Sequence, residues 1–432
     1  MKILKKIAAT IFAFVIAMFT VHAQLQEDLK TYFNDGEYFI AYGDYQEALF
    51  NYLKIEKKGI TNPNIQYRIG QCYINLEGQK TKAIPYLESA SKLITLNYQE
   101  GNVKEIQAPI DAFFFLGVAY QVNNEFDKAI DSYRKYIALL PKEDILSYKF
   151  TKQQEAACKN AKEALEKPAN ITIELLKEPI NNVSPNMYPI MAPNDSMFVY
   201  LNKMKFYDAL TVTVLNSKTG LWSNPKNINQ EILSDGFMYP TSVSADGKTI
   251  YLGMNDNFNS DIYYTNYNNE TKKWSPYSKL KGVNTKFWES NASISQDGKF
   301  LYFSSNNPKN NIGGMDIFVC ERINDKWSEP INLGTKINTE FNEEAPYITN
   351  DGNRLFFVSQ GNTKNIGGYD IFYSDKSGNG WGPAVHLPYP INTSDDETFF
   401  SPTADGEAGY LSRINDTIPK NGFDIYKFYL TK

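Results

Sequence analysis

The sequence predicts a multi-domain α + β protein in which an N-terminal array of α-helical hairpins precedes a five-bladed antiparallel β-propeller. Three patterns predict it: a hydrophobic leader, a helical repeat over the first third, and a β repeat with a period of about 51–54 residues over the remainder. We expect three segments, a signal peptide over residues 1–23, a helical domain over 24–168 and a propeller over 169–432.

The leader combines three early lysines with an apolar run over residues 7–21, and it ends with Val21 and Ala23 three and one residues before a cut. This arrangement predicts a cleavable secretory signal peptide. A membrane anchor is the alternative, but about 15 apolar residues are short for a span. The mature chain carries no later transmembrane pattern, so we expect a periplasmic protein, with association with the outer membrane left open.

The helical domain shows about three copies of one pattern, in which a glycine is followed at a regular spacing by an alanine and a tyrosine. The middle copy has one extra residue before its alanine. Small residues let two helices approach closely while aromatic rings fill the space beside them. The spacing is similar to that of tetratricopeptide repeats, and residues 147–166 read as a closing helix. The marker residues are Gly36, Ala48 and Tyr52; Gly70, Ala83 and Tyr86; and Gly117, Ala129 and Tyr133.

The β repeat is marked by a turn acid, an Asp-aliphatic-aromatic strand and a tryptophan. Each copy divides into four short antiparallel strands, and the last four turn acids are followed by glycine, which suits a tight hairpin. Four strands per copy predict a propeller blade. The turn acids are Asp195, Asp246, Asp297, Asp351 and Asp405, and the tryptophans are Trp222, Trp274, Trp327 and Trp381.

The fifth copy lacks a tryptophan strand. An open ring would leave unpaired strand edges, which favour aggregation. Residues 170–176 (NITIELL) form an isolated strand pattern before the first copy. We therefore expect this segment to complete the last blade and close the ring.

The motif at 293–317 (SISQDGKFLYFSSNNPKNNIGGMDI) resembles the WD40-like Pro-Asp repeats of TolB-type propellers. Helical repeats followed by five such blades are similar to the N-terminal half of bacterial envelope proteins linked to type IX secretion and gliding, which continue into an OmpA-like domain that this sequence lacks. The resemblance implies a non-catalytic scaffold or adaptor whose partners are envelope or outer-membrane proteins.

Composition excludes several classes of site. The net charge is −5, which gives no electrostatic footprint for nucleic acid. One of the two histidines lies in the leader, so only His386 is left, and a multi-histidine metal site is impossible. The three cysteines, Cys72, Cys158 and Cys320, have neither disulfide-framework nor zinc spacing. We expect His386 to be a strand residue, and we assign no cofactor.

One face of the propeller concentrates acidic and aromatic residues. Three glutamates lie eight residues before their turn aspartates and so occupy equivalent places at the heads of the innermost strands. They either hydrogen-bond backbone at a junction between blades, or form a mouth that binds a peptide, a basic partner loop or a cation, or act as a glycosidase pair. The candidate partner-binding residues are Glu289, Glu343, Glu397, Asp396, Trp288, Phe237 and Phe341.

A second candidate surface is the groove of the helical array, which would suit an extended peptide or a partner helix. The alternative is that the array is only a spacer packed on the propeller. The groove residues expected from repeat positions are Phe33, Glu37, Tyr67, Gln71, Asn75, Phe114 and Gln121.

Two further alternatives stay open. Asn- and Asp-rich loops at 255–261, 306–316 and 362–370 are candidate Ca²⁺ sites, although turn geometry explains the same residues. The sequence as a whole predicts an envelope scaffold. The alternative functions are a carbohydrate-active propeller enzyme and a ligand-binding sensor or accessory subunit.

Overall fold

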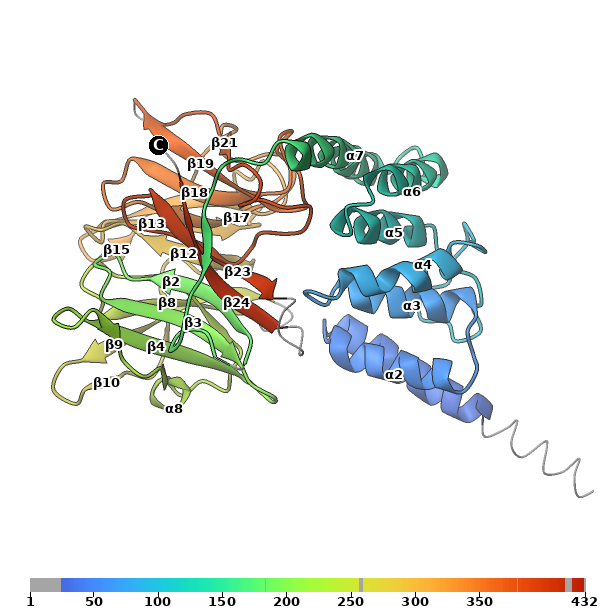
Figure 1. The fold of residues 1–432 in the computed structure, drawn as a ribbon, viewed down its shortest axis with the longest axis horizontal. Coiled ribbons are helices and arrows are strands. Elements are labelled where there is room, and N and C mark those ends of the chain that lie inside the picture. The colour runs from blue at the N-terminus through green and yellow to red at the C-terminus, as the bar shows by residue number, and fades with distance from the viewer. Residues whose placement is uncertain (1–24, 183, 256–258, 379, 416–421, 431–432) are drawn as a thin grey trace, which may run out of the picture. The chain divides into compact units, whose positions relative to one another are not determined.

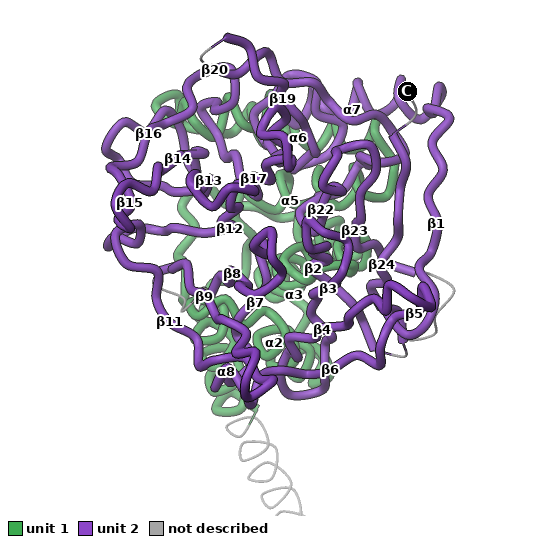
Figure 2. Tube along the Cα trace, turned by 90° about the vertical axis from the view of Figure 1, so that its left-hand side faces the viewer, with its two compact units in different colours: residues 1–152 green, residues 153–432 purple. Residues whose placement is uncertain are grey.

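The fold was determined as a computed structural model that describes residues 25–182, 184–255, 259–378, 380–415 and 422–430. The predicted signal peptide lies outside the described residues. The chain divides into two compact units, up to Lys152 and from Gln153 onward, which Figure 2 colours separately. The division falls inside a helix, whereas the sequence analysis placed the boundary at residue 168, after that helix ends.

The first unit is helical, as predicted (Figure 1). Residues 25–41 are helical, and the predicted closing helix is α7. Asp44 caps α2 by accepting the backbone N–H of Glu47, and Asn62 followed by Pro63 starts α3 in the same way. The helices of this unit after residue 41 are α2 (Tyr45–Lys57), α3 (Pro63–Ile74), the 3₁₀ helix η1 (Lys80–Ala83), α4 (Ile84–Ala90), α5 (Asp111–Val122) and α6 (Phe126–Leu139). Helix α7 (Ile145–Glu166) begins in the first unit and continues past Lys152 into the second.

Glycine lets the helices of each hairpin approach closely. A Cβ added to Gly36 would lie 2.6 Å from the Tyr52 ring, and one added to Gly117 would lie 2.5 Å from the Tyr133 ring. These are the pairs that the spacing predicted.

The middle hairpin needs a correction. A Cβ on Gly70 would meet Leu87 at 2.5 Å, so Leu87, and not Tyr86, fills the space against the glycine. Tyr86 packs on Tyr73 instead, with 5.6 Å between ring centroids. The extra residue precedes Ala83 in the 3₁₀ helix η1, and it shifts every later position by one.

The second unit contains five antiparallel sheets, which confirms the five-bladed propeller. Figure 2 shows the first strands β2, β7, β12, β17 and β22 around its centre. Blade 1 has β2 (Asn186–Met191), β3 (Met197–Lys203), β4 (Asp208–Asn216), β5 (Leu221–Trp222) and β6 (Lys226–Asn227); blade 2 has β7 (Met238–Val243), β8 (Thr249–Asn255), β9 (Ser260–Asn268), β10 (Lys273–Trp274) and β11 (Ser278–Lys279).

The next two blades repeat this plan, and the last lacks the tryptophan strand. Blade 3 has β12 (Glu289–Ile294), β13 (Phe300–Ser305), β14 (Asp316–Ile323), β15 (Lys326–Trp327) and β16 (Ile331–Asn332); blade 4 has β17 (Glu343–Ile348), β18 (Arg354–Ser359), β19 (Asp370–Ser377), β20 (Gly380–Trp381) and β21 (Val385–His386); blade 5 has β22 (Phe400–Pro402), β23 (Ala408–Asn415) and β24 (Gly422–Tyr429).

The ring closes as the sequence predicted. Strand β1 (Ile173–Leu175) pairs antiparallel with β24, with Ile173 opposite Phe428 and Leu175 opposite Tyr426. Blade 5 therefore takes its outer strand from the start of the propeller segment. The pairing covers the edge of β24 that an open ring would expose.

The turn acids act as structural acceptors. Asp297 accepts hydrogen bonds from Ser295 Oγ and the Lys299 N–H, and Gly298 between them has a φ of +71°. Asp246, Asp351 and Asp405 repeat this arrangement.

Blade 1 differs from the predicted pattern. There Asn194 is the acceptor, taking the Ser196 N–H, and Asp195 occupies the glycine position with a φ of +55°. The turn of blade 1 is therefore marked by an asparagine, one residue before the acid chosen from the sequence.

Candidate functional site

Glu343 is the first residue of β17, and its carboxylate is fully buried. Its two oxygens accept the Thr339 N–H at 2.6 Å and the Thr339 hydroxyl at 2.8 Å, and Oε1 also accepts the Ser359 hydroxyl at 2.6 Å. Burial raises the pKa of Glu343 to about 7, against the lowering effect of these three donors. The side chain thus joins the connection between blades 3 and 4 to the first two strands of blade 4.

Glu289 has the same partners in blade 3. It accepts the N–H and hydroxyl of Thr285 at 2.6 and 2.7 Å and the Ser305 hydroxyl at 3.0 Å. Only 1% of the residue is exposed, and burial raises its pKa. Two blades therefore use one arrangement, with a threonine four residues before the glutamate and a serine at the end of the second strand, directly opposite it.

Glu397 is the equivalent glutamate of blade 5, and one of its partners differs from those in blades 3 and 4. Thr393 donates its N–H at 3.0 Å and its hydroxyl at 2.6 Å. The place of the serine is taken by Arg413, whose charge lowers the pKa of Glu397, while the larger effect of burial raises it. We call Glu289, Glu343 and Glu397, with these partners, the glutamate anchors.

The contacts of the glutamate anchors support the first of the three interpretations, a hydrogen-bonded junction between blades. A mouth for a cation or a basic loop needs carboxylate oxygens that face solvent, and these are buried and occupied. A glycosidase pair needs two carboxylates with different environments. Glu289 and Glu343 share one environment, so their contacts offer no division into an acid and a base.

The other acidic and aromatic candidates are placed differently. Asp396 is exposed but accepts the Tyr369 N–H at 2.9 Å. Trp288 and Phe341 are half-buried, and Trp288 donates its backbone N–H to Asn306 at 3.0 Å. Phe237 stands apart, because 68% of it is exposed.

Phe237 belongs to an exposed apolar patch that sequence reasoning did not assemble. The patch joins the β3–β4 loop, in which 84% of Phe206 is exposed, to the connection after the short helix α8 (Asn229–Ile232). The two segments touch, because a Cβ on Gly236 would lie 2.7 Å from the Tyr207 Cβ. We call it the apolar patch; its members are Met204, Phe206, Tyr207, Leu233 and Phe237.

Sequence reasoning also missed a fivefold feature. Asn338 accepts the Ile317 N–H at 2.8 Å and donates to the Ile317 carbonyl at 3.0 Å, so one side chain satisfies both groups of a strand residue. A buried aliphatic residue followed by asparagine marks the place in every blade. We call this the asparagine clamp; it comprises Asn181, Asn229, Asn284, Asn338 and Asn392. Asn229 differs in one bond, because it accepts the Leu210 N–H but donates to the Asp208 carbonyl.

His386 lies in β21, which confirms the predicted strand position. Its Nε2 is 2.6 Å from Asp370 Oδ2. Burial raises the pKa of Asp370, and His386 and the backbone N–H groups of Ile366 and Gly367 lower it. The equivalent aspartate in blade 3, Asp316, is bound in the same way by its own loop.

These aspartates bear on the candidate Ca²⁺ loops. In loops 306–316 and 362–370 the carboxylate is turned inward onto backbone N–H groups of the loop itself. Part of the third candidate, 255–261, lies outside the described residues. Among the described residues no cluster of three or more His, Cys, Asp or Glu side chains suited to a metal ion is found.

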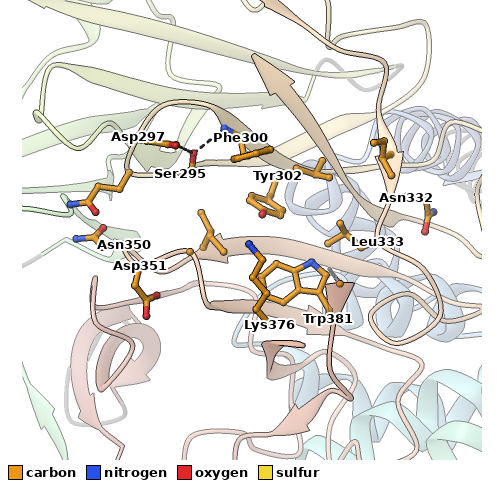
Figure 3. A pocket seen from close by; sticks show the side chains of 16 residues that line it. Ser295, Asp297, Phe300, Tyr302, Asn332, Leu333, Asn350, Asp351, Lys376 and Trp381 are labelled. Carbon is orange, nitrogen blue, oxygen red and sulfur yellow. Dashed lines mark hydrogen bonds between the residues drawn. The ribbon is translucent and has the colours of Figure 1, made fainter. Parts of the chain in front are cut away.

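A pocket of about 570 Å³ lies between blades 3 and 4, beside the Asp-Gly turns (Figure 3). Tyr302 of β13 and Trp381 of β20 both line it and meet edge to face at 6.2 Å. Trp381 is buried in the core between the two blades. Its ring thus packs between blades, as expected for the repeated tryptophans, and leaves one edge toward the pocket.

Three of the predicted groove residues of the helical unit gather around a buried arginine. Arg68 is fully buried, and its guanidinium reaches Glu37 at 2.7 Å and Gln71 at 2.9 Å. The guanidinium carbon lies 5.6 Å from the ring centre of Tyr67, which is itself buried. This cluster is an internal hydrogen-bonded network.

The remaining groove residues contribute mainly to packing. Phe33 is buried against Tyr52, and Gln121 is buried with its carbonyl accepting the Tyr133 hydroxyl at 2.8 Å. Phe114 packs on the Tyr133 ring, and Asn75 is the exposed C-cap of α3.

No helix among the described residues is long and apolar enough to cross a membrane. No protein-family model matches the sequence, and no curated protein matches it.

Solved structures match the propeller at low identity. TolB from Acinetobacter baumannii is 18% identical over 57% of this chain, with a TM-score of 0.35, and the match spans 54% of that protein, about half its length. An α-L-arabinofuranosidase from Podospora anserina is 12% identical over 60% of this chain and 94% of that chain, with a TM-score of 0.38. A thermostable family-43 glycoside hydrolase is 14% identical over 58% of this chain and 90% of that chain, with a TM-score of 0.36. These likenesses concern the propeller fold and carry no argument about function.

Proposed function

We propose that the chain is a non-catalytic scaffold or adaptor of the bacterial envelope, exported to the periplasm by its leader, which binds protein partners through the propeller. The observation that carries this proposal is the apolar patch. By the sequence resemblance, the helical unit is a tetratricopeptide-like array, and the partners belong to type IX secretion or gliding machinery at the outer membrane.

The apolar patch has the properties of a protein-binding surface. Clustered exposed apolar side chains on a soluble domain mark interaction sites, because their burial by a partner is favourable. Full burial of one phenylalanine contributes roughly 1.5–3 kcal/mol, so Phe206 and Phe237 together would supply about 3–6 kcal/mol toward the roughly 8 kcal/mol of a micromolar affinity. Both lie in loops fixed by strands, which limits the ordering cost of binding.

The glutamate anchors support the non-catalytic part of the proposal. Their oxygens are occupied by donors from the connections and strands that they join, so the residues are explained without a substrate. The acidic candidate that remains exposed, Asp396, fixes the Tyr369 backbone.

The experiment is affinity capture from an envelope fraction with immobilised residues 24–432. Wild type is compared with a Phe206→Ser/Phe237→Ser variant and with the control Leu221→Ser. Leu221 is as exposed as Phe237 and lies in β5 of the same blade as Phe206.

We expect partners that wild type and the control retain and the double variant loses. Equal recovery by all three proteins would contradict the apolar patch as the binding surface. Hydrolysis of a glycan panel by wild type, abolished by Glu343→Gln, would replace the scaffold with the carbohydrate-active alternative.

The pocket between blades 3 and 4 favours a second candidate, a ligand-binding accessory subunit. Its apolar walls and the edge of Trp381 would suit a small ligand with an aliphatic or aromatic part. Quenching of tryptophan fluorescence by such a ligand, lost in Trp381→Phe, would support it.

A further inference from the structure

Blades 3 and 4 contain two loops with the same length and the same closing motif. Loop 306–315 joins β13 to β14, and loop 360–369 joins β18 to β19. Each follows a serine, ends before an aspartate and contains Asn-Ile-Gly-Gly. In each, the asparagine donates its amide to backbone carbonyls of its own loop or the strand end beside it. Equivalent sequence and bonding make the two loops a matched pair.

The C-terminal part of α7, which belongs to the second unit, covers loop 360–369. The Asn160 amide donates to the Thr363 carbonyl at 3.0 Å and to the Asn365 carbonyl at 2.9 Å. Gln153 donates to the Asn362 carbonyl. The loop isoleucine, Ile366, is 2% exposed.

The helical face that makes this contact has a simple composition. Gln153 and Asn160 are seven residues apart, two turns along one face. Ala157 and Ala161 fall on the same face at the i+4 and i+8 positions, and both are fully buried. Small side chains let the helix backbone approach the loop, so the amides can reach its carbonyls.

Loop 306–315 has the same groups, but α7 does not bind them and no other described helix of the second unit does so. Ile312, the counterpart of Ile366, is 40% exposed. The equivalent carbonyls belong to Pro308, Lys309 and Asn311, and no side-chain donor reaches them among the residues that the structure describes. The loop and Asn342 line an open hollow of about 500 Å³.

We propose that loop 306–315 is a docking site for a helix of a partner protein, and that this helix presents two side-chain amides seven residues apart with small residues on the same face. The partner helix covers Ile312, and its amides donate to the loop carbonyls, as α7 does on blade 4. The proposal rests on the proposed scaffold function and specifies the chemistry of one partner.

The experiment uses a fluorescently labelled peptide with the sequence of residues 148–166, in reducing buffer, titrated into the full mature chain and followed by anisotropy. We expect Ile312→Lys to weaken binding at least tenfold and the milder Ile312→Ser to weaken it less. The matched control is Ile323→Lys, because Ile323 is 52% exposed and lies at the far end of β14 from the loop. The control should stay within twofold of wild type.

A second arm changes the peptide. Replacing its Asn160 with leucine removes the amide that makes two of the three hydrogen bonds and leaves Gln153 in place, so binding to the wild-type protein should fall severalfold. Equal binding to wild type and Ile312→Lys, or no binding to wild type, overturns the docking site. Neither result depends on the apolar patch, so failure here is distinct from failure of the capture experiment.

Discussion

Blades 3, 4 and 5 differ from blades 1 and 2 at the head of the innermost strand. Blades 3, 4 and 5 carry the glutamate anchors. In blade 1 the place is taken by Asn186, which accepts the amide of Asn202 opposite it at 2.8 Å, and in blade 2 by Met238 opposite Met254. The asparagine clamp is present in all five blades. The clamp asparagine is therefore common to all five blades, whereas the glutamate anchor is a second set of polar connections that blades 1 and 2 replace.

The two blades without the glutamate anchor also carry the apolar patch. Between the clamp residue Asn229 and β7 the chain forms the short helix α8 and an exposed segment that contains Phe237. In blade 3 the corresponding segment, between Asn284 and Glu289, is short and tied down by Thr285. Blade 2, which lacks the glutamate anchor, is thus preceded by a connection that exposes apolar side chains to solvent.

The largest effect is expected from placing an anchor glutamate in blade 2. Met238 is buried in an apolar cluster opposite Met254, so Met238→Glu would bury a carboxylate without the opposing serine donor that Glu289 and Glu343 have. Ser234 stands where those two glutamates have their threonine. We expect a loss of roughly 3–5 kcal/mol in unfolding free energy at pH 7, measured by denaturant titration. Met238→Leu is the control and should cost little. A loss below about 1 kcal/mol would show that blade 2 tolerates the charge and that the difference between the blades is incidental.

The next effect should come from the clamp. Asn338→Ala would leave the N–H of Ile317 without its partner in a buried strand, and the Ile317 carbonyl would keep only the Leu333 N–H at 3.1 Å. We expect a loss of about 2–4 kcal/mol by the same measurement. Asn224→Ala, in the exposed connection between β5 and β6, is the control. If the clamp variant were as stable as the control, the fivefold pattern would not be a requirement of the fold.

A smaller and pH-dependent effect is expected for Glu343. Because its folded pKa is raised to about 7, the folded state holds the proton more tightly than the unfolded chain does. Its contribution to stability is therefore complete below the unfolded pKa of about 4.5 and is lost as the pH rises through about 7. Glu343→Gln should remove this dependence, which is on the order of 3 kcal/mol between those limits.

The pH experiment compares unfolding free energies of wild type, Glu343→Gln and the exposed control Glu340→Gln across this range. The control should follow wild type. Parallel curves for all three proteins would mean that Glu343 is ionised throughout, and that its three donors outweigh its burial.

The smallest effect is expected at the hairpin turns. Asp297 is exposed, and hydrogen bonds from Ser295 and the Lys299 N–H lower its pKa. Asp297→Ala should cost about 1 kcal/mol or less, and the wild-type contribution should disappear as the pH falls through the lowered pKa. If Asp297→Ala lowered the unfolding free energy as much as Asn338→Ala does, the turns would contribute as much to the stability of the blades as the clamp.

The repeats made the fold predictable. The blade number and the closing strand follow from counting strands and asking which edge is left unpaired. The residue that packs against Gly70 in the middle hairpin could not be predicted. The one-residue insertion leaves both Tyr86 and Leu87 as candidates for that position. The turn of blade 1 was misread because an acid was chosen as the marker, whereas the geometry needs an acceptor followed by a left-handed residue.

The site was less predictable, since equivalent spacing shows that residues share a place but not which way they face. The burial of Glu343 could have been inferred from its partners, because the threonine before it and the serine after it recur at the same two spacings around Glu289. Arg68 was overlooked as the group that draws Glu37 inward. Phe206 lies in a loop of blade 1 that differs in length and sequence from those of blades 3 and 4, so no pattern distinguished it.

The pairing of β1 with β24 has a consequence for the order in which the molecule forms. Ile173 and Phe428 lie near the two ends of the propeller segment, so the first of its strands emerges from the ribosome or the export channel long before its partner. Blades 1 to 4 can assemble from local hairpins as they appear, but the last blade is completed only when the final strand arrives. A chain interrupted before β24 would hold four finished blades and a ring with a gap, exposing to proteases and chaperones the edges that the finished protein conceals.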